Sequence, residues 1–203
     1  MNLPNKLTML RLILVPVFMI FVFPLPGDFF RVAGPYIGFF VYIVASVTDL
    51  LDGKIARKRN LITDFGKFMD PIADKLLVTA GLISLTVRYW GHPYFDGKYL
   101  AWAAMIILAR EFLVAAVRMY AASRGTVVAA GKLGKLKMVF QTNAVIILFM
   151  GYIISGWPGL VWEIIGRIHI YLGAVFMLFA VVLTIISGIQ YARANLHFTE
   201  KDI

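Results

Sequence analysis

The sequence predicts an all-α integral membrane protein with six transmembrane helices and both termini in the cytoplasm. Of its 203 residues, 61% are hydrophobic, against about 45–50% in globular proteins. The mean hydropathy is +0.82. Only 15% of the residues are charged, against about 25% in a typical soluble domain. A soluble domain of this length cannot bury so many apolar side chains, so the composition excludes that class.

Six apolar stretches are long enough to cross about 30 Å of hydrocarbon as helices. They lie at roughly 7–26, 35–57, 71–90, 99–122, 134–155 and 168–192. No internal repeat, low-complexity tract or separate soluble segment interrupts them. The chain is therefore predicted to form a single transmembrane domain over residues 1–203.

The first stretch has features of a signal peptide, because Lys6 and Arg11 precede its apolar run. However, Phe23-Pro24-Leu25-Pro26 stands where the small residues of a cleavage site would be. We therefore predict a retained helix, which Pro16 can kink. In the third stretch, Pro71 either lies in the first turn with Asp70 as the cap or kinks the helix.

The distribution of basic residues predicts the orientation. With the N-terminus inside, only Arg31, Arg88, Lys98 and Arg167 of the 20 Lys and Arg residues fall toward the outer face. The formal net charge of +9 fits anionic lipid and phosphorylated substrates. Nucleic acid is not an expected partner, because no basic run lies outside the apolar stretches. The absence of cysteine excludes disulfides and thiolate metal sites.

Four aspartates lie where the second and third helices are predicted to approach each other. Asp49 and Asp52 are three residues apart, and Asp70 and Asp74 are four apart, so each pair projects from one helical face. A short connection makes the two helices antiparallel neighbours, and all four carboxylates can converge. Oxygen ligands without His or Cys suit Mg²⁺ or Mn²⁺, and four carboxylates can hold two ions.

Two such ions suit phosphoryl chemistry, because they neutralise a diphosphate and stabilise the attacking and leaving oxygens. Gly53 and Gly66 allow close approach of the backbone to a ligand, and Arg57 offers a fork for phosphate oxygens. The alternative is that the aspartates only cap helices and pair with nearby Lys and Arg side chains at the membrane edge.

The pattern Asp49-x2-Asp52-Gly53-x2-Ala56-Arg57-x8-Gly66-x3-Asp70-x3-Asp74 resembles the signature of the CDP-alcohol phosphotransferase family. This resemblance implies a phosphatidyltransferase that uses CDP-diacylglycerol and releases CMP, and it also suggests a homodimer. It implies that Asp49, Asp52 and Asp70 bind metal, and that Asp74 both binds metal and acts as the catalytic base. The residues implied to bind CDP-diacylglycerol are Gly53, Ala56, Arg57 and Gly66, with Thr63, Asn5 and Thr8 as weaker candidates.

Two further segments, 2–11 and 110–141, resemble the bacterial phosphatidylglycerophosphate synthases of that family. This resemblance implies sn-glycerol 3-phosphate as the acceptor and phospholipid biosynthesis as the role. It also implies a bacterial cytoplasmic membrane location with the active site toward the cytoplasm. Inositol phosphate remains open as another acceptor for the same chemistry.

Four cations on the fourth and fifth stretches are the candidate acceptor site. Arg110 and Arg118 lie two turns apart, and Lys135 and Lys137 stand at the start of the fifth stretch. Apolar helices carry such charges at a cost, so an anion is expected to balance them. A phosphomonoester such as glycerol 3-phosphate would serve. The alternatives are snorkelling to lipid headgroups and an internal pair with Glu111.

A membrane transporter coupled to ions or protons is the rival from a different functional class, because it too can carry Asp and Arg within the membrane. Such a protein has no need of Gly and Ala at fixed spacing between two Asp pairs. The sequence therefore favours the enzyme.

Overall fold

The computed structural model describes residues 3–23, 25–59, 64–123 and 131–195, and this part of the chain consists of helices joined by turns and loops. Within these ranges, the side chains of 3–4, 50–59, 64–65, 67–68, 122–123, 132 and 194–195 are outside the description. The helices are α1 (Leu3–Val22), α2 (Asp28–Val32), α3 (Gly34–Arg59), α4 (Asp64–Arg88), α5 (Gly97–Ser123), α6 (Lys132–Ser155) and α7 (Leu160–Asn195).

Each of the six predicted stretches coincides with one long helix, but two helices begin earlier than the apolar pattern indicates. α4 begins at Asp64, so Pro71 lies inside the helix and Asp70 is not its cap. α7 begins at Leu160 rather than near residue 168. Both extensions carry polar or charged residues, which a search for apolar stretches leaves out. The short helix α2 has too few residues to give a periodic pattern.

Four of the described helices are long and apolar enough to cross a membrane, namely α1, α5, α6 and α7. The candidate spans are Asn5–Val22, Gly97–Ala121, Leu133–Ser155 and Leu160–Arg193. α3 and α4 are also long, but they carry the aspartates and several basic residues, which lower their hydropathy. The chain is thus an all-helical protein with multiple candidate membrane spans.

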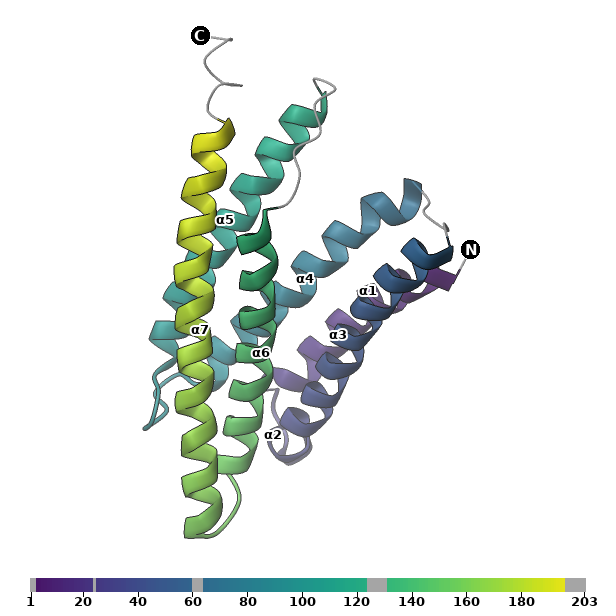
Figure 1. Ribbon diagram of the computed structural model, residues 1–203. Coiled ribbons are helices and arrows are strands. Elements are labelled where there is room, and N and C mark those ends of the chain that lie inside the picture. The colour runs from purple at the N-terminus through teal and green to yellow at the C-terminus, as the bar shows by residue number, and fades with distance from the viewer. Residues whose placement is uncertain (1–2, 24, 60–63, 124–130, 196–203) are drawn as a thin grey trace.

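The helices form two groups that diverge toward one end of the molecule. Figure 1 shows α1, α3 and α4 inclined away from α6 and α7 toward the end where α1 begins and α7 ends. α6 and α7 make the most extensive helix pair, and α1 packs chiefly on α3 and then on α4. A Cβ added at Gly166 of α7 would lie 2.6 Å from Ser155 Cα, so α6 and α7 meet closely where the chain turns between them.

The apolar core lies where the two groups join. Phe18 of α1, Tyr42 of α3 and Phe149 of α6 are buried, and their ring centroids lie 5.4–6.1 Å apart. Tyr89, which follows α4, donates its buried hydroxyl to the carbonyl oxygen of Leu148 at 2.7 Å. This core fixes α3 and α4 against α6 and leaves the diverging ends free to form a site.

Candidate functional site

Three of the four predicted carboxylates are described, and they come from the two predicted helices. Asp49 lies on α3, and Asp70 and Asp74 lie on α4. Asp49 is close enough to both Asp70 and Asp74 for their negative charges to repel. Asp70 is exposed, and Asp49 and Asp74 are partly buried. The structure therefore brings these three aspartates together at one end of the α3–α4 pair.

Helix α1 supplies polar partners to two of these aspartates. The guanidinium of Arg11, which is fully buried, lies 2.6 Å from Asp49 Oδ1. Thr8 donates its hydroxyl to Asp70 Oδ1 at 2.6 Å. Residues 8 and 11 are one turn apart, so a single face of α1 contacts α3 and α4. α1 thus helps to orient the carboxylates.

Sequence reasoning did not assign Arg11 to the site, and it predicted Thr8 only as a binder of CDP-diacylglycerol. A signal for Arg11 was present, because a cation inside an apolar helix requires a partner. The spacing alone could not identify Asp49 as that partner, since the two residues are far apart in the chain. The predicted donor-binding residues Asn5 and Gly66 are both buried.

A second cluster of charges lies on α5 and α6, and α7 adds a hydroxyl group to it. Lys137 Nζ lies 2.5 Å from Glu111 Oε1, and an Arg110 guanidinium nitrogen lies 3.3 Å from the same oxygen. Arg110 also donates to the hydroxyl of Ser187 at 3.2 Å. Lys137 is buried, and Glu111 is only 22% exposed. Arg110 and Lys137 thus share one carboxylate, and these three groups carry a net charge of about +1.

The other two predicted acceptor residues are exposed. Arg118 lies on α5 with its guanidinium carbon 5.8 Å from the centre of the Tyr191 ring, and Lys135 lies in the first turn of α6. The described part of the protein does not bury either side chain, so both can contact an incoming anion. A cation over an aromatic face is held with only modest strength.

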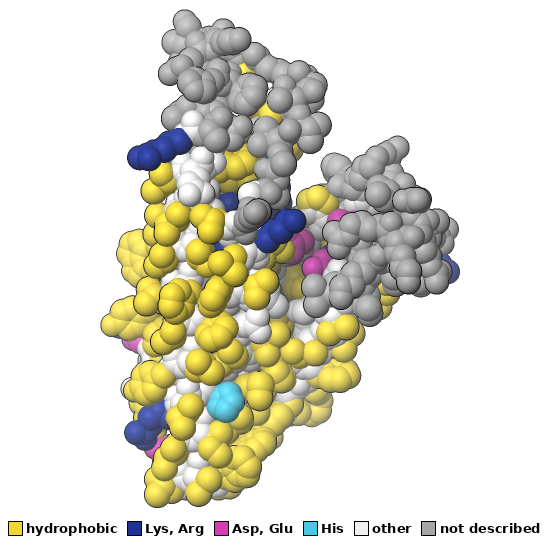
Figure 2. All heavy atoms as spheres, in the orientation of Figure 1, with side chains coloured by type: hydrophobic (Ala, Val, Ile, Leu, Met, Phe, Trp, Pro, Cys, Tyr) yellow, Lys and Arg dark blue, Asp and Glu magenta, His cyan; other side chains and the backbone are white. Residues whose placement is uncertain are grey.

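The aspartates and the second cluster face each other across a hollow. Asp74 is within electrostatic range of Glu111, and Lys137 is within range of Asp74. Figure 2 shows acidic side chains in the hollow between the two helix groups, with a basic side chain beside them. The arrangement can hold a strongly anionic ligand with its charge shared between metal ions and fixed cations.

The described residues contain no group of three or more His, Cys, Asp or Glu side chains already close enough to hold a metal ion. The carboxylate-only donor set fits Mg²⁺ or Mn²⁺. Asp49 repels both Asp70 and Asp74, which fits the same interpretation, because a bound cation would relieve this repulsion. The side chains of Asp52, Gly53, Ala56 and Arg57, together with residue Thr63, lie outside the described residues.

Comparison with known proteins is consistent with this geometry. Residues 1–189 match the family described as CDP-alcohol phosphatidyltransferase. The chain is 39% identical to a CDP-diacylglycerol–glycerol-3-phosphate 3-phosphatidyltransferase of Bacillus subtilis, over 96% of this chain and 95% of the relative. It is 38% identical to a Rickettsia typhi protein of the same name, over 95% and 96%. It is 35% identical to a probable phosphatidylglycerophosphate synthase of Mycobacterium tuberculosis, over 95% and 81%.

Proposed function

The chain belongs to the CDP-alcohol phosphatidyltransferase family, and we propose on that basis that it is a phosphatidylglycerophosphate synthase. It transfers the phosphatidyl group of CDP-diacylglycerol to sn-glycerol 3-phosphate and releases CMP. Similarity at 34–39% identity over nearly the whole chain, to relatives named for this reaction or its product, supports the assignment. The acceptor is the part of the reaction that the family alone leaves open, and inositol phosphate is the rival acceptor.

One structural observation carries the proposal, namely that carboxylates of α3 and α4 face a basic cluster of α5 and α6 across a single hollow. The reaction needs both kinds of group, because the donor carries a diphosphate and the acceptor carries a phosphomonoester. A site with only carboxylates, or with only basic side chains, would leave one of the two substrates without groups that bind its phosphates. Opposite placement allows the two substrates to meet between them.

The metal ligands in this proposal are Asp49, Asp52, Asp70 and Asp74, which would hold one or two Mg²⁺ or Mn²⁺ ions. The bound ions would neutralise the donor diphosphate and stabilise the leaving CMP phosphate. Arg11 and Thr8 keep Asp49 and Asp70 in fixed orientations, through the 2.6 Å contacts that they make with these carboxylates. α1 therefore prepares the ligand set before the substrate arrives.

Asp74 is the proposed general base. It lies one turn beyond Asp70 on α4 and is partly buried, and it is within electrostatic range of Glu111 across the hollow. Asp74 takes the proton of the 1-hydroxyl of glycerol 3-phosphate while that oxygen forms a bond to the phosphatidyl phosphorus. The bond from this phosphorus to the CMP oxygen breaks, and CMP leaves with the electron pair.

The donor pocket is proposed to comprise Asn5, Thr8, Gly53, Ala56, Arg57, Thr63 and Gly66, which hold the CDP group while the acyl chains stay in the bilayer. Asn5 and Gly66 are both buried, and the helices that carry them, α1 and α4, pack against each other, which supports a shared location for the two residues. Thr8 donates its hydroxyl to Asp70, so its role is in part to orient a metal ligand. The nucleotide would then lie against the carboxylates that bind its diphosphate.

The acceptor pocket is proposed to use Arg118 and Lys135 as direct phosphate ligands, because both are exposed. Arg110 and Lys137 are engaged by Glu111 and contribute the remaining positive charge. Arginine offers two parallel N–H groups to a phosphate and lysine a compact point charge. This combination suits a small phosphomonoester better than serine, which has no phosphate.

The proposed enzyme is a homodimer in the cytoplasmic membrane, with six helices crossing the bilayer and both termini inside. The start of α1 and the end of α7 (Figure 1) lie at the same end of the molecule as the hollow (Figure 2), which supports a site open to the cytoplasm. The positive-inside distribution of basic residues supports the same orientation. α3 and α4 complete the six crossings in this proposal.

The experiment is to measure CMP released from CDP-diacylglycerol by the purified protein in detergent, with Mg²⁺ and with each acceptor in turn. We expect rapid release with glycerol 3-phosphate and only slow release with inositol phosphate, serine or no acceptor. Excess EDTA should abolish the activity. Equal or faster release with inositol phosphate would overturn the acceptor, and full turnover in EDTA would overturn the metal site. No release with any acceptor would favour the transporter.

A further inference from the structure

Two adjoining pockets lie at the opposite end of the molecule from the aspartates, where α1 and α4 end. The first has a volume of about 440 Å³ and is lined by Leu25, Pro26, Gly27, Asp28, Arg31 and Arg88. The adjoining pocket, of about 410 Å³, also includes Arg31. Two arginines therefore line one cavity outside the proposed active site, where they have no role in the transfer reaction.

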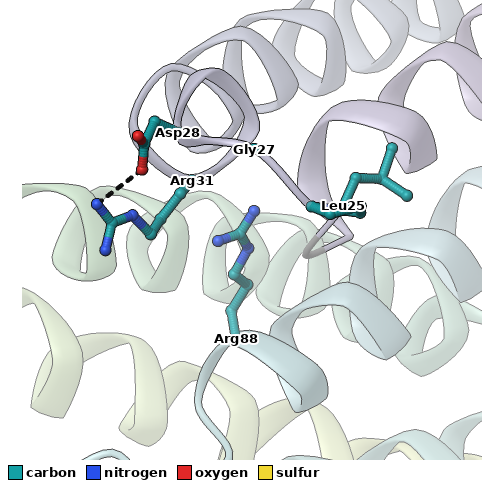
Figure 3. Close-up of a pocket in the computed structure, with 6 residues that line it drawn as sticks. Leu25, Gly27, Asp28, Arg31 and Arg88 are labelled. Atoms are coloured by element: carbon teal, nitrogen blue, oxygen red, sulfur yellow. Dashed lines mark hydrogen bonds and ion pairs between the residues drawn. The ribbon is translucent and has the colours of Figure 1, made fainter.

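Arg88 is held in place by the end of α1. Its Nε donates to the carbonyl oxygen of Val22 at 2.6 Å, and one terminal nitrogen donates to Phe21 O at 3.5 Å. These carbonyls lie at the negative end of the helix, which attracts a cation. The two bonds fix the guanidinium and leave its other N–H groups for a ligand in the pocket. Figure 3 shows the Arg88 side chain extended toward Gly27.

Arg31 is free to change partners. Among the described residues, its guanidinium pairs with Asp28 at 3.0 Å, and the side chains of this pair are 78% and 89% exposed. An exposed ion pair is worth less than about 1 kcal/mol. A ligand oxygen can therefore compete for this guanidinium at little cost. Figure 3 shows Arg31 next to Arg88 and joined to Asp28.

The charge of this region selects an anion. Arg31 and Arg88 outnumber the single carboxylate of Asp28 among the lining residues of the first pocket. In the adjoining pocket, burial lowers the pKa of His92, so this ring is neutral at pH 7 and adds no charge. The two guanidinium groups match the unesterified oxygens of a phosphate.

The surroundings point to a phosphate carried by a lipid. Phe29 and Val32 of α2 are 58% and 61% exposed beside the arginines. Trp157 and Trp162 are also partly exposed at this end, where amphipathic rings mark the membrane interface. A phosphate bound by Arg31 and Arg88 would have apolar side chains next to it, against which acyl chains can pack. A free phosphate ion gains nothing from those neighbours.

We propose that Arg31 and Arg88 bind the phosphate of an anionic membrane phospholipid at the end of the protein opposite to the active site. The fixed guanidinium of Arg88 provides the permanent contact, and Arg31 turns from Asp28 to complete it. In the proposed orientation, the site lies at the outer membrane face. The lipid bound there is structural, since the pocket is remote from the reacting groups.

The test is native mass spectrometry of the full-length protein in neutral detergent, titrated with phosphatidylglycerol, phosphatidylcholine or inorganic phosphate. We expect one phosphatidylglycerol to be retained with higher affinity than phosphatidylcholine. Arg31→Gln should weaken its retention by about 10-fold. Lys98→Gln is the matched control, because Lys98 lies at the same end, pairs with Asp96 and lines neither pocket. This control should leave retention unchanged.

A further variant gives an effect of opposite sign. Asp28→Asn removes the competing carboxylate and should tighten retention, while CMP release by both Arg31→Gln and Asp28→Asn stays at the wild-type rate. Equal retention by wild type and Arg31→Gln would overturn the site. Saturation by inorganic phosphate at similar affinity would overturn its assignment to a lipid, and equal retention of phosphatidylcholine would overturn its selectivity for an anion.

Discussion

At the scale of single residues, the site depends on polar contacts that α1 makes with carboxylates of other helices. Arg11 and Thr8 each contact one aspartate at 2.6 Å. From the aspartates of the motif, the sequence predicted a carboxylate site suited to Mg²⁺ or Mn²⁺. Motif spacing could not predict these two contacts, because they join residues that are 38 and 62 positions apart. Only the packing of α1 on α3 and α4 brings them together.

Thr8→Val tests whether α1 orients a metal ligand. The substitution keeps the side-chain shape and removes the donor to Asp70. We expect the Mg²⁺ concentration for half-maximal activity to rise by about 10-fold, the low end for a hydrogen bond to a charged group. Thr8→Ser should stay close to wild type. If Thr8 instead only binds the donor, the KM for CDP-diacylglycerol will rise and the Mg²⁺ dependence will not change.

Glu111→Gln tests the buried charge cluster. Lys137 is buried and lies 2.5 Å from Glu111, so the variant leaves a buried cation without its counter-charge. We expect a loss of stability approaching roughly 3–5 kcal/mol, measured by unfolding in mixed micelles. We also expect a raised KM for glycerol 3-phosphate, because Arg110 and Lys137 lose their common anchor.

The control for this variant is Asp28→Asn, which removes an exposed partner of Arg31 and should cost less than about 1 kcal/mol. Glu111→Asp should recover part of the stability and part of the KM. Wild-type stability and kinetics in Glu111→Gln would show that the cluster neither supports the fold nor organises the acceptor pocket.

At the scale of helices, apolar length predicted the six long elements, while their ends depended on residues that carry no apolar signal. α4 extends to Asp64 through a polar segment, with Pro71 inside it. The extension matters for function, because it places Asp70 and Asp74 within a continuous helix opposite Asp49. The pairing of α6 with α7 depends on glycines whose packing role a hydropathy pattern cannot reveal.

Gly166→Ala tests that pairing. An added Cβ would lie 2.6 Å from the backbone N and Cα of Ser155, which cannot move away without separating the two helices. We expect the melting temperature in detergent to fall by several degrees, as for an overpacked interface that costs about 1–3 kcal/mol. Gly131→Ala is the control, because a Cβ there meets no atom within 4 Å. Equal melting temperatures for both variants and wild type would contradict the close contact.

At the scale of the whole molecule, two helix groups join at an apolar core and diverge around the site (Figure 1). The family resemblance of residues 49–74 is confirmed by the match over residues 1–189. The fold class could be predicted because composition limits the chain to membrane helices. The hollow between the groups could not be predicted, because it depends on which helices pack together and which separate.

Labelling of lysines tests the orientation. Lys6 lies in α1 near the end that carries the site, and Lys98 lies in the first turn of α5 at the other end. Both are exposed. An amine reagent that does not cross membranes should label Lys98 in intact cells and should label Lys6 only after permeabilisation. Labelling of Lys6 alone in intact cells would show that the orientation is the reverse of the proposed one. Lys6→Arg and Lys98→Arg are the controls that assign the label to each lysine.

The kcat of Asp74→Asn tests most directly the central claim that the carboxylates of this hollow carry out phosphatidyl transfer. The measurement is CMP release from CDP-diacylglycerol with saturating glycerol 3-phosphate and Mg²⁺. The side chain keeps its size but cannot accept the hydroxyl proton, so we predict that kcat falls by about 10²–10⁴-fold while the folded protein still binds CDP-diacylglycerol. A kcat close to wild type would contradict the account, because the proton would then have another acceptor and the reaction another centre.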